Sequence, residues 1–194
     1  MIQETTPSAP AESDDEYLLL ARYGAVPQVA RFSVSQELMA QLTAGTDDLH
    51  GSQVVVESER GTEVASVLEA IHPGVNPTPK ASTGRVLRIA APQDLTSAAD
   101  NRREAELSFL DWLEQIDEWQ LQLQLIDMET TLDGQRILYV LNGQDAETTR
   151  LALLVAANGR GVVQVQPVSH EGVEVKAGGG GCGSGCGSGG CSTH

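Results

Sequence analysis

The sequence is poor in cysteine, and its three cysteines, Cys182, Cys186 and Cys191, all lie near the end of the chain. A disulfide framework needs an even number of cysteines spread through the fold, so the sequence excludes one. Long apolar runs are also lacking: the run at 151–157 is far shorter than the roughly 20 residues that a membrane helix needs. We therefore expect a soluble protein without a membrane segment.

Basic residues are few, because 12 Lys and Arg stand against 27 Asp and Glu, which gives a net charge of −15 at pH 7. Nucleic-acid-binding proteins usually carry a basic surface that neutralises phosphates. The composition therefore argues against direct nucleic-acid binding and leaves only a local basic patch, for example Arg60, Lys80, Arg85 and Arg88. An acidic surface serves solubility or recognises basic partner proteins, and the composition leaves both open.

The first sixteen residues are polar and acidic and contain neither Lys nor Arg. Targeting peptides begin with basic residues, and a secretory signal adds an apolar run, so this composition argues against both kinds of leader. We expect a cytoplasmic protein in which residues 1–15 form a disordered acidic N-terminus.

Residues 16–90 have the composition of a β-rich half-domain. Runs rich in β-branched and aromatic residues alternate with glycine and proline turns, a pattern typical of short strands. The expected elements are two strands at 17–34 around a turn at Gly24 and Pro27, a short helix near 36–42, a hairpin at 53–71 and a strand at 85–90.

Residues 91–170 predict the order α-β-β-α-β. Pro92 suits the first position of a helix, where its missing N–H is harmless, and Asp94 suits the first turn, where the helix dipole favours an acid. Asp133-Gly134 predicts a tight hairpin turn. The expected elements are a helix at 92–119, strands at 120–131 and 136–141, a helix at 146–157 capped by Asp145, and a strand at 161–166 that ends at Pro167.

Together the two halves predict an α+β domain over residues 16–170, in one compact unit with helices on one side of an antiparallel sheet. The long helix is expected to pack a stripe of Phe109, Trp112, Leu113 and Ile116 on that sheet.

Two groups of charged residues interrupt the strands. Glu57, Glu59, Arg60 and Glu63 surround the first hairpin turn, which we interpret as a solvated turn with an ion pair rather than a catalytic carboxylate pair.

Asp127 and Glu129 lie on the face of Leu123 and Leu125 if the alternation is plain, and on the opposite face only if a bulge intervenes. Plain alternation means that the strand leaves the core there. The sequence contains no catalytic triad, phosphate loop or HExxH motif, and we predict no catalytic site.

Residues 171–194 predict a flexible tail, since glycine fills half of the positions from Ala177 onward. Thiolates at short spacing suit Zn²⁺ or an iron-sulfur cluster, both of which take up to four ligands. Cys182, Cys186 and Cys191 would supply three ligands and His194 a fourth. The spacing C-x₃-C-x₄-C is not a common zinc spacing, so the alternative is a tail whose cysteines are merely reactive.

Three stretches resemble the bacterial PSP1 C-terminal domain, in the order of that family and within residues 17–167. The first, Val54-Val-Val-Glu-Ser-Glu-Arg-Gly-Thr-Glu, is similar to the family's strand and E-x-E-R-G-x-E turn. The second is Arg88-Ile-Ala-Ala-Pro-Gln-Asp-Leu with the long helix through Asn101-Arg-Arg-Glu-Ala-Glu. The third, residues 123–140, is similar to the family's L-V-D-V-E-x-x-F-D hairpin, and Cys186-Gly-Ser-Gly-Gly-Cys191-Ser is similar to its C-G-x-x-x-C-C segment.

This resemblance implies a non-catalytic regulatory adaptor that acts by contact with other proteins. The complexes of such family members influence RNA processing and phosphorelay signalling, and their cysteines are implicated in iron-sulfur binding. Eukaryotic relatives of the domain are linked to polymerase suppression and imply the alternative function of a nucleic-acid-associated factor.

Overall fold

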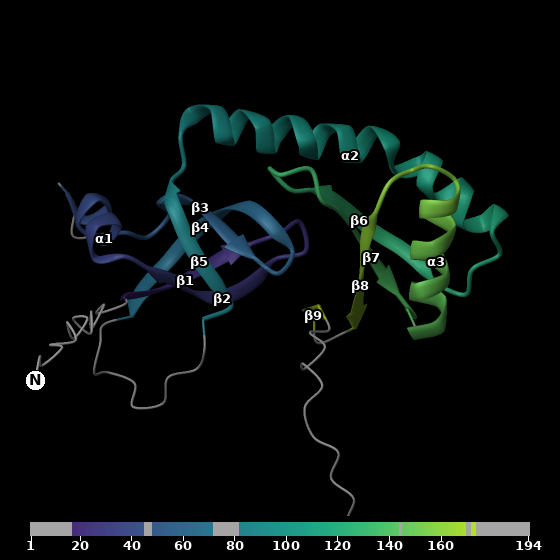
Figure 1. Cartoon of the computed structure of the whole chain (residues 1–194), viewed down its shortest axis with the longest axis horizontal. Coiled ribbons are helices and arrows are strands. Elements are labelled where there is room, and N and C mark those ends of the chain that lie inside the picture. The colour runs from purple at the N-terminus through teal and green to yellow at the C-terminus, as the bar shows by residue number, and fades with distance from the viewer. Residues whose placement is uncertain (1–16, 45–47, 72–81, 144, 170–171, 174–194) are drawn as a thin grey trace, which may run out of the picture.

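Two lobes lie side by side along one long helix, α2 (Pro92–Glu118), in a computed structural model of the chain (Figure 1). The structure describes residues 17–44, 48–71, 82–143, 145–169 and 172–173. A β-rich lobe precedes α2 and a mixed lobe follows it, so the predicted α+β class and the β-rich first half are both confirmed. Among the described helices, none combines the length and apolar character of a membrane span.

The first lobe is a closed barrel with the strand order β1-β2-β5-β3-β4. Alternating side chains of these strands fill its core, and Leu19, Phe32, Val54 and Val67 are completely buried. The elements are β1 (Tyr17–Tyr23), β2 (Gln28–Val34), α1 (Gln36–Thr43), β3 (Gln53–Ser58), β4 (Gly61–Ile71) and β5 (Gly84–Ile89). All of them lie within two residues of the predicted bounds.

The barrel closes through a short parallel pairing of β2 with β5. Only Phe32 and Ser33 pair there, with Gly84 and Arg85 respectively. A Cβ atom on Gly84 would lie 1.9 Å from the carbonyl oxygen of Glu57, so this approach of strands requires glycine. No local sequence pattern indicates this closure, because its partners are far apart in the chain.

The second lobe is a sheet of order β6-β7-β8-β9 with α2 and α3. The strands are β6 (Gln124–Thr130), β7 (Arg136–Leu141), β8 (Val163–Ser169) and β9 (Gly172–Val173), and α3 (Asp145–Ala157) connects β7 to β8. Strand β6 runs antiparallel to β7, but β8 runs parallel to it. The predicted antiparallel sheet is therefore wrong at this pair, because α3 makes a crossover connection, which returns the chain in the same direction.

Two strand boundaries also differ from the prediction. Gln120 has φ 53°, a left-handed conformation that ends α2, and β6 begins only at Gln124. Pro167 lies inside β8, opposite Val140, rather than ending the strand. Strand β9 pairs with β8 only from Val168 onward, so Pro167 lies at a sheet edge, where a missing N–H is tolerated.

Each lobe has its own hydrophobic core. Residues of the barrel and α1 form one cluster, and residues of α2, the sheet and α3 form the other. No buried residue in the described part of the chain belongs to both. As predicted, α2 packs Trp112 and Ile116 on the sheet, with Phe109 and Leu113 partly buried beside them. The two lobes are therefore held together by α2 and by the contacts between their surfaces.

The barrel closure predicts that Gly84→Ala destabilises the protein by more than about 2 kcal/mol, because a methyl group would push β3 and β5 apart. Gly51→Ala is the control, since Gly51 has φ 80° but nothing within 4 Å of a Cβ atom. Backbone strain alone should cost about 1–2 kcal/mol there. Urea unfolding of both variants measures the difference, and equal losses would contradict the steric argument.

Candidate functional site

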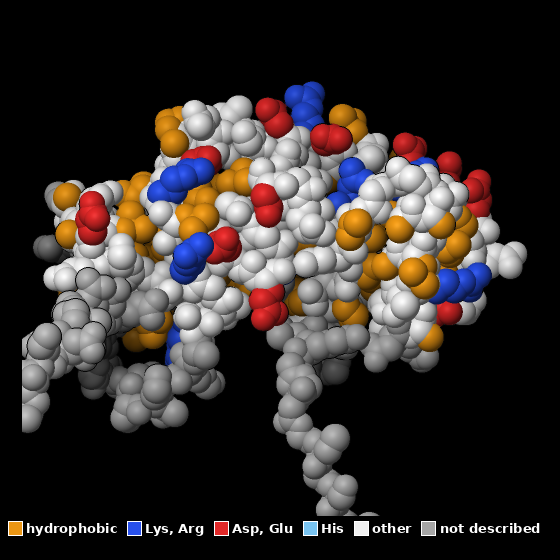
Figure 2. Space-filling view, viewed as in Figure 1, with side chains coloured by type: hydrophobic (Ala, Val, Ile, Leu, Met, Phe, Trp, Pro, Cys, Tyr) orange, Lys and Arg blue, Asp and Glu red, His pale blue; other side chains and the backbone are white. Residues whose placement is uncertain are grey.

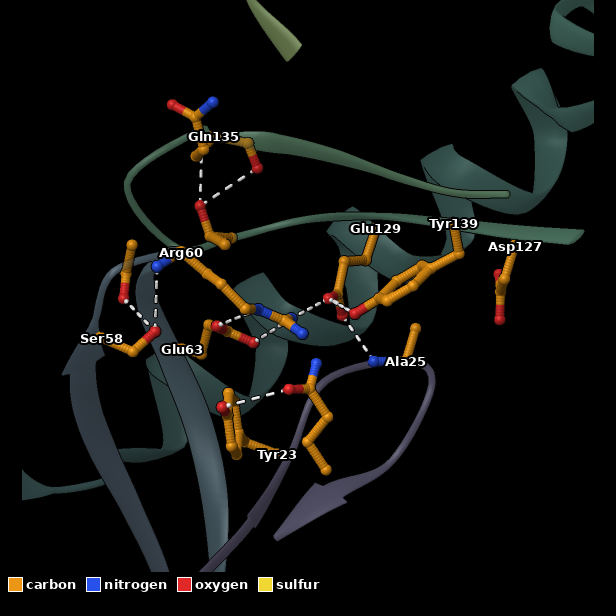
Figure 3. Close-up of polar contacts among 12 residues, drawn as sticks. Tyr23, Ala25, Ser58, Arg60, Glu63, Asp127, Glu129, Gln135 and Tyr139 are labelled. Carbon is orange, nitrogen blue, oxygen red and sulfur yellow. Dashed lines mark hydrogen bonds and ion pairs between the residues drawn. The ribbon is translucent and has the colours of Figure 1, made fainter. Parts of the chain in front are cut away.

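The lobes meet at a buried ionic cluster, in which the β3–β4 turn approaches the β6–β7 hairpin (Figure 3). Arg60 lies in the turn between β3 and β4, and Glu63 follows on β4. Their side chains are 8% and 6% exposed. The interpretation of this turn as solvated is wrong for Arg60 and Glu63, which the second lobe covers, and correct for Glu57 and Glu59, which are exposed. The predicted ion pair is present.

One guanidinium serves carboxylates from both lobes. Nε of Arg60 donates to Oε1 of Glu63 at 3.1 Å and Nη2 donates to Oε2 at 2.8 Å. Nη2 also donates to Glu129 of β6. The guanidinium carbon lies 5.1 Å from the ring centre of Tyr23 and 5.6 Å from that of Tyr139, so a cation–π contact is made in each lobe.

Glu129 is the carboxylate that the second lobe contributes to this cluster. It accepts a hydrogen bond from the backbone N–H of Ala25, in the β1–β2 turn, at 2.6 Å. Glu129 also accepts a hydrogen bond from the hydroxyl of Tyr139 on β7, and the Tyr139 side chain is completely buried. Glu129 therefore joins two turns of the barrel to two strands of the sheet, as Figure 3 shows.

A bulge in β6 turns Glu129 toward the barrel. The register with β7 shifts between Leu125 and Asp127, so that Leu125 and Met128 both face the core of the second lobe. Asp127 and Glu129 consequently lie on the opposite face. Of the two alternatives for this strand, the bulge is the one that occurs, and plain alternation is wrong. The Asp127 side chain is also held against the second lobe, because it accepts a hydrogen bond from Nη1 of Arg102 on α2 at 2.8 Å.

Backbone groups strengthen the junction next to the cluster. The N–H of Leu132 donates to the carbonyl of Thr62 at 2.8 Å, and the N–H of Thr62 donates to Oδ1 of Asp133 at 3.0 Å. Gly61 has φ 126°, and a Cβ atom there would lie 2.7 Å from the same Asp133 oxygen. The side chain of Gln164 on β8 adds a hydrogen bond to the carbonyl of Glu59 at 3.2 Å.

The start of α2 is fixed to the barrel by a second ion pair. Both Nη atoms of Arg88, on β5, donate to the carboxylate of Asp94, in one case at 2.9 Å. The N–H of Ala91 donates to the same carboxylate at 2.8 Å. The hydrogen bonds from Arg88 and Ala91 lower the pKa of Asp94. The predicted first turn of this helix is thus correct, and Asp94 also orients α2 on the barrel.

The ionic cluster contains more negative than positive groups. Burial raises the pKa of the Glu63 carboxyl to about 7, while Arg60 acts in the opposite direction and Glu129 adds to the increase. Burial likewise raises the pKa of the Tyr139 hydroxyl. A cavity of about 210 Å³, between the barrel, α2 and β6, is lined by Glu63, Glu129 and Arg102. Protonation of Glu63 balances the two carboxylates against one arginine.

A different feature lies on the side of α2 that faces away from both lobes. Leu107 and Leu110 are 77% and 68% exposed. The exposed acids on this side of the helix are Glu104, Asp111, Glu114, Asp117 and Glu118, and the exposed Arg103 lies one turn before Leu107. Glu106 is exposed as well, but it pairs with Arg102 at 2.9 Å on the side of α2 next to β6. We call the surface formed by the two leucines and these five acids the α2 outer face. Figure 2 shows acidic (red), hydrophobic (orange) and basic (blue) side chains along the upper edge, over α2.

Basic residues do reach the end of α2, but on its inner side. Arg150 of α3 donates to the carbonyl of Trp119 at 3.2 Å. Arg160 donates to the side-chain oxygen of Gln115 at 3.0 Å, and its guanidinium carbon lies 5.3 Å from the ring centre of Trp112. The acids of the α2 outer face remain exposed to solvent.

The predicted metal ligands Cys182, Cys186, Cys191 and His194 lie outside the described residues, as do residues 1–16, and the metal site stays a prediction. Within the described part of the chain, no group of His, Cys, Asp and Glu side chains has the arrangement of a metal site.

The contact between the two lobes was not predicted from the sequence, although one residue pattern indicated it. Glu63 shares the inward face of β4 with Ala65 and Val67, where alternation requires a buried residue.

The shared guanidinium predicts that Arg60→Met destabilises the protein by about 3–5 kcal/mol, because two buried carboxylates lose their partner. Arg85→Met is the matched control. Arg85 pairs with Glu57 at 2.7 Å, but both side chains are exposed, at 65% and 47%. Removal of such a surface pair should cost less than about 1 kcal/mol. Chemical denaturation measures the loss of unfolding free energy in each variant. Similar losses in both variants would refute a central role for Arg60.

The pKa of Glu63 predicts a specific dependence of stability on pH. The raised pKa, about 7 against an ordinary 4.5, means that the folded protein holds a proton that the unfolded chain releases. This contribution is fully present below about pH 4 and is lost as the pH rises to about 7. The unfolding free energy of the wild type, relative to Glu63→Gln, should fall by about 1–3 kcal/mol between pH 5 and 8. Parallel pH profiles would show that Glu63 does not titrate as inferred.

The structure brings the first and third motif stretches together, since Arg60 and Glu63 of one contact Glu129 of the other. The resemblance to the PSP1 C-terminal domain rests on those motifs and stays a prediction. Comparisons with family models, with curated proteins and with solved structures found no match to this chain.

Proposed function

We propose that this protein is a non-catalytic regulatory adaptor of the cytoplasm that binds other proteins through the α2 outer face. The observation that carries the proposal is the exposure of Leu107 and Leu110, at 77% and 68%, on the side of α2 that neither lobe covers. Their spacing of three places the two side chains next to each other on the helix.

Single exposed leucines are common on protein surfaces, but a pair rimmed by charged groups has the layout of a protein interface, with an apolar centre and a polar rim. Complete burial of one leucine side chain contributes about 1.5–3 kcal/mol. Two of them contribute about 3–6 kcal/mol, which offsets part of the free energy lost on association, and the charged rim contributes the rest for a weak, reversible partner.

The frame around α2 supports the same function. Arg88 and Asp94 hold its first turn on the barrel, while Trp112 and Ile116 bury its second half in the other core. The helix is therefore presented to solvent in a fixed orientation, which lowers the entropy lost when a partner binds.

The resemblance to the PSP1 C-terminal domain suggests the kind of complex in which the adaptor acts. That complex would contain several proteins and would influence RNA processing and phosphorelay signalling. In that setting Cys182, Cys186, Cys191 and His194 would hold an iron-sulfur cluster or Zn²⁺, bound by the tail rather than by the folded lobes.

The proposal predicts a pull-down result from the native cytoplasm. The Leu107→Ser/Leu110→Ser variant should retain at most about one tenth of the partner protein that the wild-type chain retains. The melting temperature should not change, because both side chains are exposed. Leu153→Ser is the control, since Leu153 lies on α3 and is 65% exposed. A double variant that retains the full partner set would contradict the proposal, and so would a wild-type chain that retains no partner.

A further inference from the structure

Acids of the α2 outer face flank its two leucines. Residues three or four positions apart are neighbours on a helix surface. Leu107 is therefore next to Glu104 and Asp111, and Leu110 is next to Glu114. All these carboxylates are exposed. Arg103 is the basic neighbour of Leu107, on its N-terminal side, so negative charge predominates around the apolar centre.

The helix C-terminus carries more acid than its own stability favours. Asp117 and Glu118 occupy the last turn, and no basic residue of α2 lies there. The helix dipole disfavours negative charge at this end, and the exposed Glu114 and Glu118 also repel each other at a spacing of four. Departures from local preference of this kind are expected where a surface has a function.

From these observations we infer that the α2 outer face binds a basic amphipathic helix of a partner protein. The inference rests on the proposed function and names the chemistry of the partner. Such a helix carries a stripe of leucine-sized side chains that cover Leu107 and Leu110. Lys or Arg residues on both edges of that stripe meet the carboxylates.

The dimensions of the face suit a partner helix of about four turns. The span from Glu104 to Glu118 is about 21 Å at the 1.5 Å rise per residue of an α-helix. Four turns hold about 14 residues, which place apolar side chains at two or three successive turns.

The same charges disfavour other occupants. A second copy of this chain would bring an identical acidic face and a net charge of −15. Nucleic acids and anionic lipid surfaces carry negative phosphates, which the acids of this face repel. Complementary charge is thus provided by a basic protein segment.

Defined peptides and the purified full-length chain test this inference. The probe is a fluorescent helical peptide of about 16 residues with leucines on one stripe and lysines elsewhere. One comparison peptide has the same composition in an order without amphipathicity, and another has glutamate in place of lysine. By fluorescence anisotropy at low salt, the probe should bind at least tenfold more tightly than either comparison peptide, and added salt should weaken it.

Charge-reversed variants then locate the binding site. Asp111→Lys/Glu114→Lys should weaken the probe at least tenfold, and Leu107→Ser/Leu110→Ser should do the same. Glu37→Lys/Glu69→Lys is the matched control, because it changes the net charge equally at exposed positions of the barrel lobe, away from the junction with the second lobe. Its affinity for the probe should stay within about twofold of the wild type.

Each other outcome overturns the inference in a distinct way. Equal weakening by the barrel control would show general attraction between an acidic protein and a basic peptide. Self-association in sedimentation, abolished by Leu107→Ser/Leu110→Ser, would assign the face to a second copy. If the native partner depends on the leucines but tolerates Asp111→Lys/Glu114→Lys, the proposed function stands and the basic partner helix is wrong.

Discussion

The arrangement of the two lobes depends on a single guanidinium that is shared between them. Arg60 and Glu63 belong to the barrel, Glu129 belongs to the sheet, and all three are largely removed from water. A buried charge without a partner is strongly unfavourable, so the barrel turn and the bulged strand β6 require each other. The two separate hydrophobic cores stabilise their own lobes, whereas this cluster determines how the lobes are oriented.

Helix α2 converts that arrangement into a surface that a partner can use. Its first turn is bound to β5 through Arg88 and Asp94, and its later turns are buried through Trp112 and Ile116. These contacts fix the inner side of the helix along its length. The outer side is consequently free to carry leucines and acids that neither lobe requires for its stability, and its residues are available for recognition.

Local patterns in the sequence were enough to predict most of the elements. Pro92 and Asp94 mark the start of α2, and β7 has the predicted bounds, because capping and alternation act over a few residues. The barrel closure between Phe32 and Gly84 and the contact between Arg60 and Glu129 each join residues more than 50 positions apart in the chain. Such pairings depend on the assembled fold, and only the inward position of Glu63 indicated one of them.

Each lobe is formed by a continuous stretch of chain, and this order has a consequence for synthesis on the ribosome. The barrel, which ends at Ile89, leaves the ribosome and is able to close before β6 has emerged from it. Until β6 and β7 arrive, Arg60 and Glu63 lie on an open flank of the nascent protein, where water solvates them. Their burial is therefore a late event, in which the second lobe docks onto a barrel that already exists and displaces that water.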